Sequence, residues 1–130
     1  MDPRLFAAAS AAMERAYAPY SKFQVGAAIL AGNGQIYSGC NVENAAYPNG
    51  TCAEAGAIAA MVRDGAQQIR EIVVIGRGDL LCTPCGGCRQ RIREFAAPDT
   101  RIYVCGPEGL RHTFTRDELL PASFGPENLA

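Results

Sequence analysis

The spacing of apolar and polar residues changes character several times along this chain of 130 residues. Apolar side chains alternate with other residues from Phe23 to Ile29, and Asn33-Gly34 follows, which predicts a strand and a tight hairpin turn. Residues 35–40 would return as the second strand. EIVVIG at 71–76 and RIYVC at 101–105 are continuous apolar runs, typical of strands that are covered on both faces.

Helical patterns separate these strands. The first helix is predicted over residues 3–16, with Asp2 as its N-cap and a proline in its first position. A second helix, with Thr51 as the capping residue, is predicted over residues 52–64, and a third over residues 85–95.

The resulting order is helix, hairpin, helix, strand, helix and strand. The segment RHTFT at 111–115 adds an edge strand, and TRDE at 115–118 resembles a capping box. This alternation predicts an α/β fold, namely a three-layer α/β/α sandwich around a mixed five-stranded sheet. The length predicts a single domain over residues 1–130.

The composition argues against several classes of function. The formal net charge is −1, so no basic surface is available to bind a nucleic acid polymer. The stretch from Phe23 to Val42 has 20 uncharged residues, the length of a membrane span, but its Asn-Gly turn favours a hairpin and no membrane association is expected. The N-terminus lacks the cationic segment of an export signal, which favours a cytoplasmic protein with reduced cysteines.

Three of the six cysteines, Cys82, Cys85 and Cys88, are separated by two residues each. Such spacing serves iron–sulfur clusters, dithiol redox pairs and metal sites. A bacterial-type cluster motif would need another cysteine three residues after Cys88, where Arg-Gln-Arg-Ile stands instead. A redox pair would leave Cys52 without a role.

A metal site uses both cysteine-containing segments. Cys52-Ala53-Glu54 has the form ligand-x-Glu, and Pro84 to Cys88 has the form P-C-x-x-C, a combination typical of zinc-dependent nucleobase deaminases. Both segments lie at predicted helix N-termini, where Cys85 and Cys88 share one face. Glu54 would then lie beside the metal without being a ligand.

A structural zinc site with four cysteines is the main alternative from a different functional class. Cys82 would be the fourth ligand in that case. A carboxylate two residues from a ligand has no structural use but has a catalytic one, which favours three protein ligands and an open position.

Longer motifs are distributed over most of the chain. PYSKFQVGAA, GCNVENAAYP, TCAE, PCGGCRQ and LLPASFGPENL, which extend from Pro19 to Leu129, together resemble the small homotetrameric cytidine deaminases. The resemblance implies one zinc ion per chain, held by Cys52, Cys85 and Cys88 with water as the fourth ligand.

The family's reaction is hydrolytic deamination of cytidine and 2′-deoxycytidine to uridine and 2′-deoxyuridine, in pyrimidine salvage. By resemblance, Glu54 would take the water's proton, the resulting hydroxide would attack C4, and Glu54 would deliver the proton to N3. The backbones of Ala53 and Thr83 would contact the base. A carboxylate suits this role because an apolar and anionic environment raises its pKa.

The resemblance also implies how the rest of a free nucleoside is bound. Asn41 and Glu43 would bind the ribose, Phe23 and Phe124 would pack around the base and sugar, and Tyr47 would help to shape the same pocket. Phe124 would come from a neighbouring subunit, so that active sites are shared within a homotetramer; the alternative is that it docks on the core of its own chain. A related aminopyrimidine nucleoside, such as a blasticidin-type compound, is the alternative substrate.

One position departs from the family's pattern. Many members have arginine directly after the catalytic glutamate, where it offsets thiolate charge, but here the residue is Ala55. Arg77, Arg89 or the helix dipoles alone are expected to take over this compensation.

Overall fold

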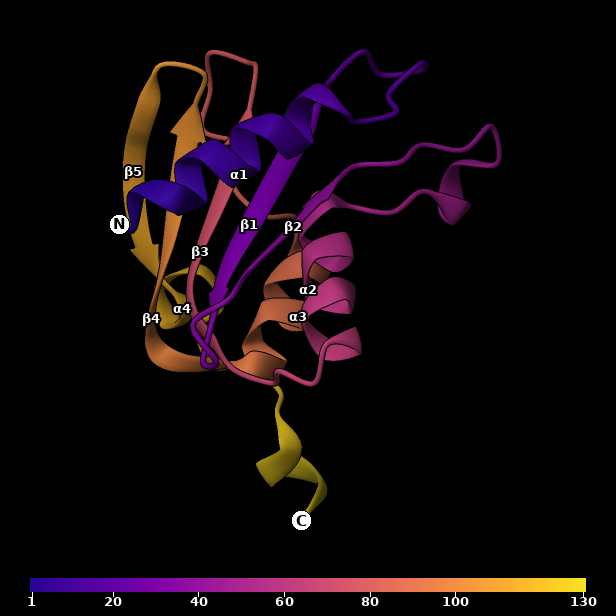
Figure 1. The fold of residues 1–130 in the computed structure, drawn as a ribbon. Coiled ribbons are helices and arrows are strands. Elements are labelled where there is room, and N and C mark those ends of the chain that lie inside the picture. Colours follow the sequence, from indigo (N-terminus) through magenta and orange to yellow (C-terminus); the bar gives the residue numbers. More distant parts are fainter.

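The computed structural model describes residues 1–130 and contains a mixed sheet of five strands in the order β2-β1-β3-β4-β5 (Figure 1). The strands are β1 (Val25–Ala31), β2 (Ile36–Cys40), β3 (Ile69–Gly76), β4 (Ala96–Gly106) and β5 (Gly109–Thr115). The α-helices are α1 (Pro3–Glu14), α2 (Ala53–Arg63), α3 (Gly86–Phe95) and α4 (Arg116–Leu119), and 3-10 turns cover Tyr47–Asn49 and Pro126–Leu129. Only β3 and β4 pair in parallel.

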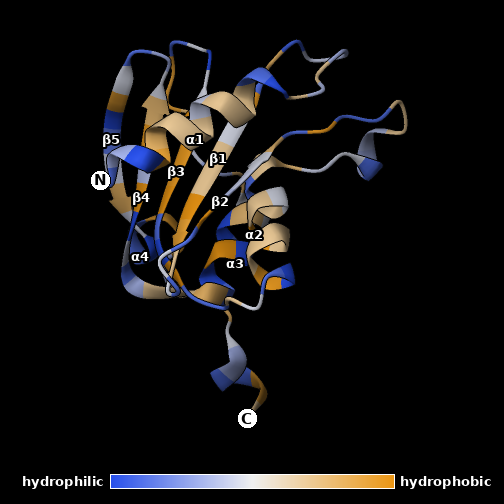
Figure 2. Ribbon diagram, viewed as in Figure 1, coloured by the Kyte–Doolittle hydropathy of each residue, from blue (hydrophilic) through white to orange (hydrophobic).

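Helices cover both faces of the sheet, which confirms the predicted three-layer arrangement. On one face, α1 packs its buried residues Leu5, Ala9 and Met13 against the sheet. On the other face, α2 and α3 lie side by side and share a larger apolar cluster with the strands (Figure 1). The most hydrophobic segments are the central strands, whereas the connecting loops are mainly hydrophilic (Figure 2).

Side chains along β1 point alternately to the two faces of the sheet, so this strand contributes to the apolar clusters on both faces. Ala27 and Ile29 belong to the cluster under α2 and α3, and Ala28 belongs to the cluster under α1. Gly26 is required where α1 crosses the strand, because a Cβ there would lie 2.1 Å from the carbonyl oxygen of Ala9. The close contact of α1 with the sheet therefore depends on a missing side chain.

The uncharged stretch from Phe23 to Val42 contains the predicted hairpin. β1 and β2 pair antiparallel, and Gly34 in the turn has a φ of 82°, a left-handed conformation that favours glycine. In addition, no helix of this chain combines the length and the apolar character that crossing a membrane would require.

Several predicted boundaries were wrong. Helix α1 ends at Glu14 rather than Ala16, because the chain turns there so that Tyr17 can pair with the 41–42 segment. Thr51 does not cap α2: its backbone exchanges two 2.9 Å hydrogen bonds with Val42, so that Cys52 becomes the N-cap. Strand β4 begins five residues before the apolar run that predicted it. The capping box at Thr115 and Glu118 is confirmed.

Two loops extend from the end of the sheet at which α2 and α3 begin. Residues 15–24 and 41–52 project together in Figure 1 and are joined by the bridge between Tyr17 and Val42. The rings of Tyr20 and Tyr47 also contact each other across the loops at an interplanar angle of 59°, with centroids 5.9 Å apart. The C-terminal segment extends from the opposite end of the molecule (Figure 1).

Candidate metal centre

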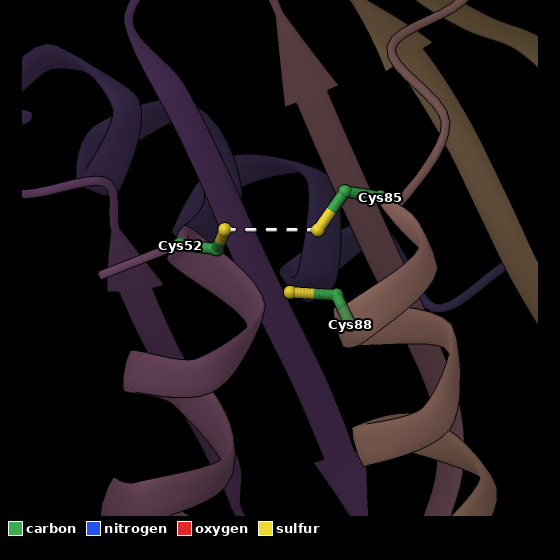
Figure 3. A group of neighbouring side chains, drawn as sticks. All are labelled: Cys52, Cys85 and Cys88. Atoms are coloured by element: carbon green, nitrogen blue, oxygen red, sulfur yellow. Dashed lines mark hydrogen bonds between the residues drawn. The ribbon is translucent and has the colours of Figure 1, made fainter. Parts of the chain in front are cut away.

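Three cysteines converge between the first turns of α2 and α3. The sulfur atoms of Cys52, Cys85 and Cys88 all lie within 4.8 Å of one another, and those of Cys52 and Cys85 are 3.9 Å apart. The three side chains point toward a common centre (Figure 3). The structure thus brings together the three ligands that the sequence predicted.

Helix N-termini place these sulfurs. Cys52 is the N-cap of α2, Cys85 is the N-cap of α3, and Cys88 follows in the first turn of α3. The positive ends of both helix dipoles are therefore directed toward the thiol groups, where they favour negative charge. This arrangement agrees with the helix-dipole form of charge compensation predicted from the sequence.

The donor set fits a zinc ion. Zinc binds thiolates at about 2.3 Å in tetrahedral geometry, which places two sulfur ligands about 3.8 Å apart. The 3.9 Å between Cys52 and Cys85 agrees with this spacing. All six cysteines are free thiols, so no disulfide competes for these ligands.

Cys82 lies outside this group of three cysteines and packs beside Gly76 and Phe23 instead. A Cβ on Gly76 would lie 2.8 Å from the Cβ of Cys82 and 3.1 Å from the ring of Phe23, which shows how closely the three residues meet. Burial raises the pKa of the Cys82 thiol to about 11. The four-cysteine structural site therefore does not form, and three protein ligands are the arrangement of catalytic zinc centres.

Glu54 is a buried carboxylate beside the three sulfurs. It is the second residue of α2 and only 4% of its surface is exposed. Burial raises the pKa of Glu54, and the positive charge of Arg91 partly counters this effect. The negative charge of Glu54 adds to burial in raising the pKa of Cys88. A carboxyl group whose pKa is raised by burial is a stronger base than a free carboxylate, which suits it to accept a proton and pass it on.

The two other cysteines of the cluster, Cys52 and Cys85, differ in their electrostatic environment. Burial raises the pKa of the Cys52 thiol. Burial also opposes ionisation of Cys85, but hydrogen bonds from Cys88 and Cys52 hold the pKa of that thiol below its usual value. Cys85 is accordingly the thiol of the three that ionises most readily.

Asn41 and Glu43 hold the segment that precedes β1. Oδ1 of Asn41 accepts a 2.8 Å hydrogen bond from the Val25 backbone, and its Nδ2 donates to the carbonyl of Phe23 at 2.9 Å. Glu43 accepts hydrogen bonds from two backbone N–H groups, those of Tyr20 at 2.9 Å and Ser21 at 3.1 Å, and from the Ser21 hydroxyl. Each of the two residues has hydrogen-bonding capacity left for a ligand.

Two cavities adjoin these residues. One has a volume of about 350 Å³ and is lined by residues that include Glu43 and Tyr47. The other has a volume of about 580 Å³ and lies between Phe23 and the loop that carries Cys82 and Thr83. Among the other predicted contacts, Ala53 is buried in the first turn of α2.

Phe124 lines neither cavity. Its side chain is 56% exposed, and its carbonyl accepts a 2.9 Å hydrogen bond from Gln90 on α3. The rest of the C-terminal segment is anchored by Arg93, which donates to Ser123 at 3.0 Å and pairs with Glu127 at 2.5 Å. Within one chain, Phe124 therefore stays away from the metal centre.

The two arginines expected to offset thiolate charge are directed elsewhere. Arg77 pairs with Glu14 and donates to Gln24, and Arg89 donates to the carbonyls of Pro84 and Leu119. The prediction that either one compensates the thiolates is therefore wrong, because their guanidinium groups are used in other contacts.

Sequence reasoning missed two other arginines. Nη1 of Arg91 lies 3.5 Å from the sulfur of Cys88, a contact that the i, i+3 spacing along α3 could have indicated. Arg111 on β5 donates hydrogen bonds to the carbonyls of Gly78 at 2.5 Å and Leu80 at 3.1 Å, and so holds the loop that leads to Thr83. No local pattern predicts the second contact, since it joins an edge strand to a distant loop.

Comparisons with known proteins agree with this site. Residues 1–105 match the family model described as the cytidine and deoxycytidylate deaminase zinc-binding region. The chain is 42% identical over 127 residues to a cytidine deaminase of Sporosarcina psychrophila, covering 98% of this chain and 93% of that protein. It is 39% identical over 118 residues to a cytidine deaminase of Halalkalibacterium halodurans, covering 91% and 89%.

Solved structures show the same fold. The crystal structure of a cytidine deaminase from Burkholderia pseudomallei superposes with a TM-score of 0.88 at 37% identity, over 95% of this chain and 99% of that one. That of a cytidine deaminase from Mycobacterium tuberculosis gives 0.82 at 34% identity, over 96% and 98%. Family model, sequence identity and fold therefore agree that the chain belongs to the cytidine deaminase family of enzymes.

Proposed function

We propose that this chain catalyses the zinc-dependent hydrolytic deamination of cytidine and 2′-deoxycytidine to uridine, 2′-deoxyuridine and ammonia, as a step of pyrimidine salvage. The observation that carries the proposal is the convergence of three cysteines beside the buried Glu54. Residues 1–130 would act as one catalytic domain, with one zinc ion held by Cys52, Cys85 and Cys88.

The catalytic role belongs to Glu54. When bound, zinc supplies Lewis acidity that makes a water molecule nucleophilic at neutral pH. Glu54 would accept a proton from that water, deliver it to N3 of the cytosine ring, and then assist the departure of ammonia. Its burial suits this shuttle, because the raised pKa brings the carboxyl group closer to the working pH.

The remaining residues would bind and orient a free nucleoside. Phe23 and the backbones of Ala53 and Thr83 would hold the base, and the cavity at Phe23 and Thr83 supports this placement. Asn41 and Glu43 would bind the ribose, with Tyr47 shaping that part of the pocket. A carboxylate near the sugar disfavours a 5′-phosphate by charge repulsion.

Phe124 would complete the site of a neighbouring subunit in a homotetramer. Its exposure, and its absence from the linings of the two cavities of its own chain, support a role in another copy. The six free cysteines favour the reducing conditions of the cytoplasm as the enzyme's location.

The direct test combines a zinc assay with an ultraviolet assay for loss of cytidine. We expect one zinc ion per chain and turnover of both nucleosides by the purified protein. Glu54→Gln should retain zinc but lose about 10²–10⁴-fold or more in rate, because it removes the proton shuttle. Glu94→Gln, at an exposed position on α3, is the matched control and should behave like the wild type. Normal turnover by the Glu54→Gln variant would contradict the proposal.

A further inference from the structure

The side chain of Arg91 lies against a sulfur of the metal centre. Arg91 follows Cys88 by three residues on α3, and its Nη1 approaches Sγ of Cys88 to 3.5 Å. Long side chains in a helix point back toward its N-terminus, which directs this guanidinium to the end of α3 where the ligands are.

The absence of a side chain at position 87 keeps this path open. A Cβ on Gly87 would lie 3.1 Å from Nη1 of Arg91 and 3.9 Å from its Cζ. The guanidinium therefore passes directly over the glycine. A side chain at position 87 would require only a small shift of this flexible arginine, so the contact with Cys88 depends mainly on Arg91.

The charge of Arg91 has no carboxylate to satisfy it. None of the five ion pairs of the chain includes this residue, and its side-chain hydrogen bond is the one to Cys88. By contrast, three thiolates around a divalent ion leave one net negative charge, to which Glu54 adds another when ionised. The positive charge of Arg91 also acts on Glu54, whose pKa it lowers against the effect of burial.

We propose that Arg91 is a positioning residue that acts through Cys88: its guanidinium donates a charge-assisted hydrogen bond to the ligand sulfur and so reduces the electron density that this sulfur gives to the metal. This inference rests on the zinc centre proposed above. Outer groups that donate to a ligand tune the metal without touching the substrate. Less sulfur donation leaves the ion a stronger Lewis acid.

The test replaces the charge while keeping the bulk of the side chain. In Arg91→Met the hydrogen bond and the charge are lost, and in Arg91→Lys the charge is kept. Arg63→Met, an exposed arginine at the far end of α2 with no ion pair, is the control. Each variant is prepared with zinc for kinetics and with cobalt for absorption spectroscopy, and thermal unfolding of the zinc form checks that it is folded.

The expected spectroscopic result concerns the sulfur-to-cobalt charge-transfer band. Loss of a hydrogen bond raises the energy of the sulfur electrons, so Arg91→Met should move this band to longer wavelength, whereas Arg91→Lys and Arg63→Met should leave it near the wild-type position. If Arg91 only shielded the metal centre from solvent, the charge-transfer band of Arg91→Met would stay unchanged. That result, or a band in Arg91→Lys shifted as far as in Arg91→Met, would overturn the inference.

The kinetic result should follow the same order. Arg91→Met should lose about tenfold in kcat, the lower end of what a charge-assisted hydrogen bond contributes, with KM nearly unchanged since Arg91 does not contact substrate. Lysine should restore part of the loss. A protein without bound zinc or turnover would refute the proposed function itself, whereas an active zinc enzyme insensitive to Arg91→Met would refute only this inference.

Discussion

At the scale of single residues, chemically identical side chains have different roles because their surroundings differ. Cys82, Cys85 and Cys88 follow one another at equal spacing, but only the last two lie at the start of α3 with their sulfurs near Cys52. Cys82 lies before the helix begins and is packed against Gly76. Spacing along the chain therefore says less about ligation than the position at which a helix starts.

Substitution of individual cysteines should reveal this difference. Cys88→Ser is expected to lose most of its zinc, because a hydroxyl is a poor replacement for a thiolate ligand. Cys82→Ser should keep about one zinc ion per chain, since this thiol is outside the ligand group. Metal analysis of the two purified proteins checks the prediction, and zinc loss from Cys82→Ser would show that Cys82 is a ligand.

The raised pKa of Cys82 predicts low reactivity toward alkylating agents. The thiolate is the reactive form, and a thiol with a pKa of about 11 is ionised to roughly one part in a thousand at pH 8. Cys82 should therefore react slowly with iodoacetamide, and faster as the pH rises toward 11. Peptide mass spectrometry of the zinc-loaded enzyme after timed labelling measures this. Rapid labelling at pH 8 would show that burial does not suppress the thiolate.

At the scale of elements, the geometry of the metal centre depends on how closely α2 lies against β2. Gly39 on β2 faces the first turns of α2, and a Cβ there would lie 2.5 Å from the carbonyl oxygen of Ala53 and from the backbone N of Ala57. These are backbone atoms that cannot rotate away. Gly39 therefore allows the short distance between the start of α2, which carries Cys52 and Glu54, and the sheet.

Gly39→Ala should destabilise the enzyme by about 1–3 kcal/mol, the usual cost of overpacking, and should weaken zinc binding because α2 must move. Gly56→Ala is the matched control on the opposite side of the same contact. Its Cβ would meet the Cα of Gly39 at 3.6 Å, an ordinary distance, and alanine favours a helix by about 0.5–1 kcal/mol over glycine. Urea unfolding and a chelator competition assay compare the two, and equal stability would contradict the steric argument.

Regular patterns made the elements predictable, whereas interactions between distant segments did not. The apolar runs of β3 and β4 and the asparagine–glycine turn after β1 correspond to observed elements because burial and turn geometry act locally. Thr51 failed as a helix cap because pairing with Val42, nine residues earlier, fixes its backbone. Arg91 could have been inferred from helical spacing, but the contact of Arg111 with the 78–80 loop requires the folded sheet.

At the scale of the whole molecule, the two ends of the sheet have different roles. The metal centre and the loops that frame the cavities lie at one end, whereas the C-terminal segment leaves from the other (Figure 1). Arg93 and Gln90 hold that segment on α3, so Phe124 is presented on a fixed support rather than on a free tail. Such a support suits docking against a second copy.

A mixing experiment tests whether active sites are shared. Glu54→Gln removes catalysis, and Phe124→Ala is expected to raise KM severalfold by removing an aromatic contact to the nucleoside of a neighbouring subunit. When the two variants are unfolded and refolded together, some sites combine an intact Glu54 with an intact Phe124. At low cytidine concentration the mixture should exceed the summed activity of the separate variants. Simple additivity, with light scattering showing mixed oligomers, would contradict shared sites.

The central position of β3 has a consequence for synthesis of the chain. β3 lies between β1 and β4, and it separates Cys52 from Cys85 and Cys88 along the sequence. A nascent chain that ends before residue 69 therefore leaves the inner edge of β1 open, and open edges pair readily with other chains. Metal capture must wait until Cys88 has emerged from the ribosome, so zinc uptake can begin only after β1, β2 and β3 have been synthesised and while β4 and β5 still follow.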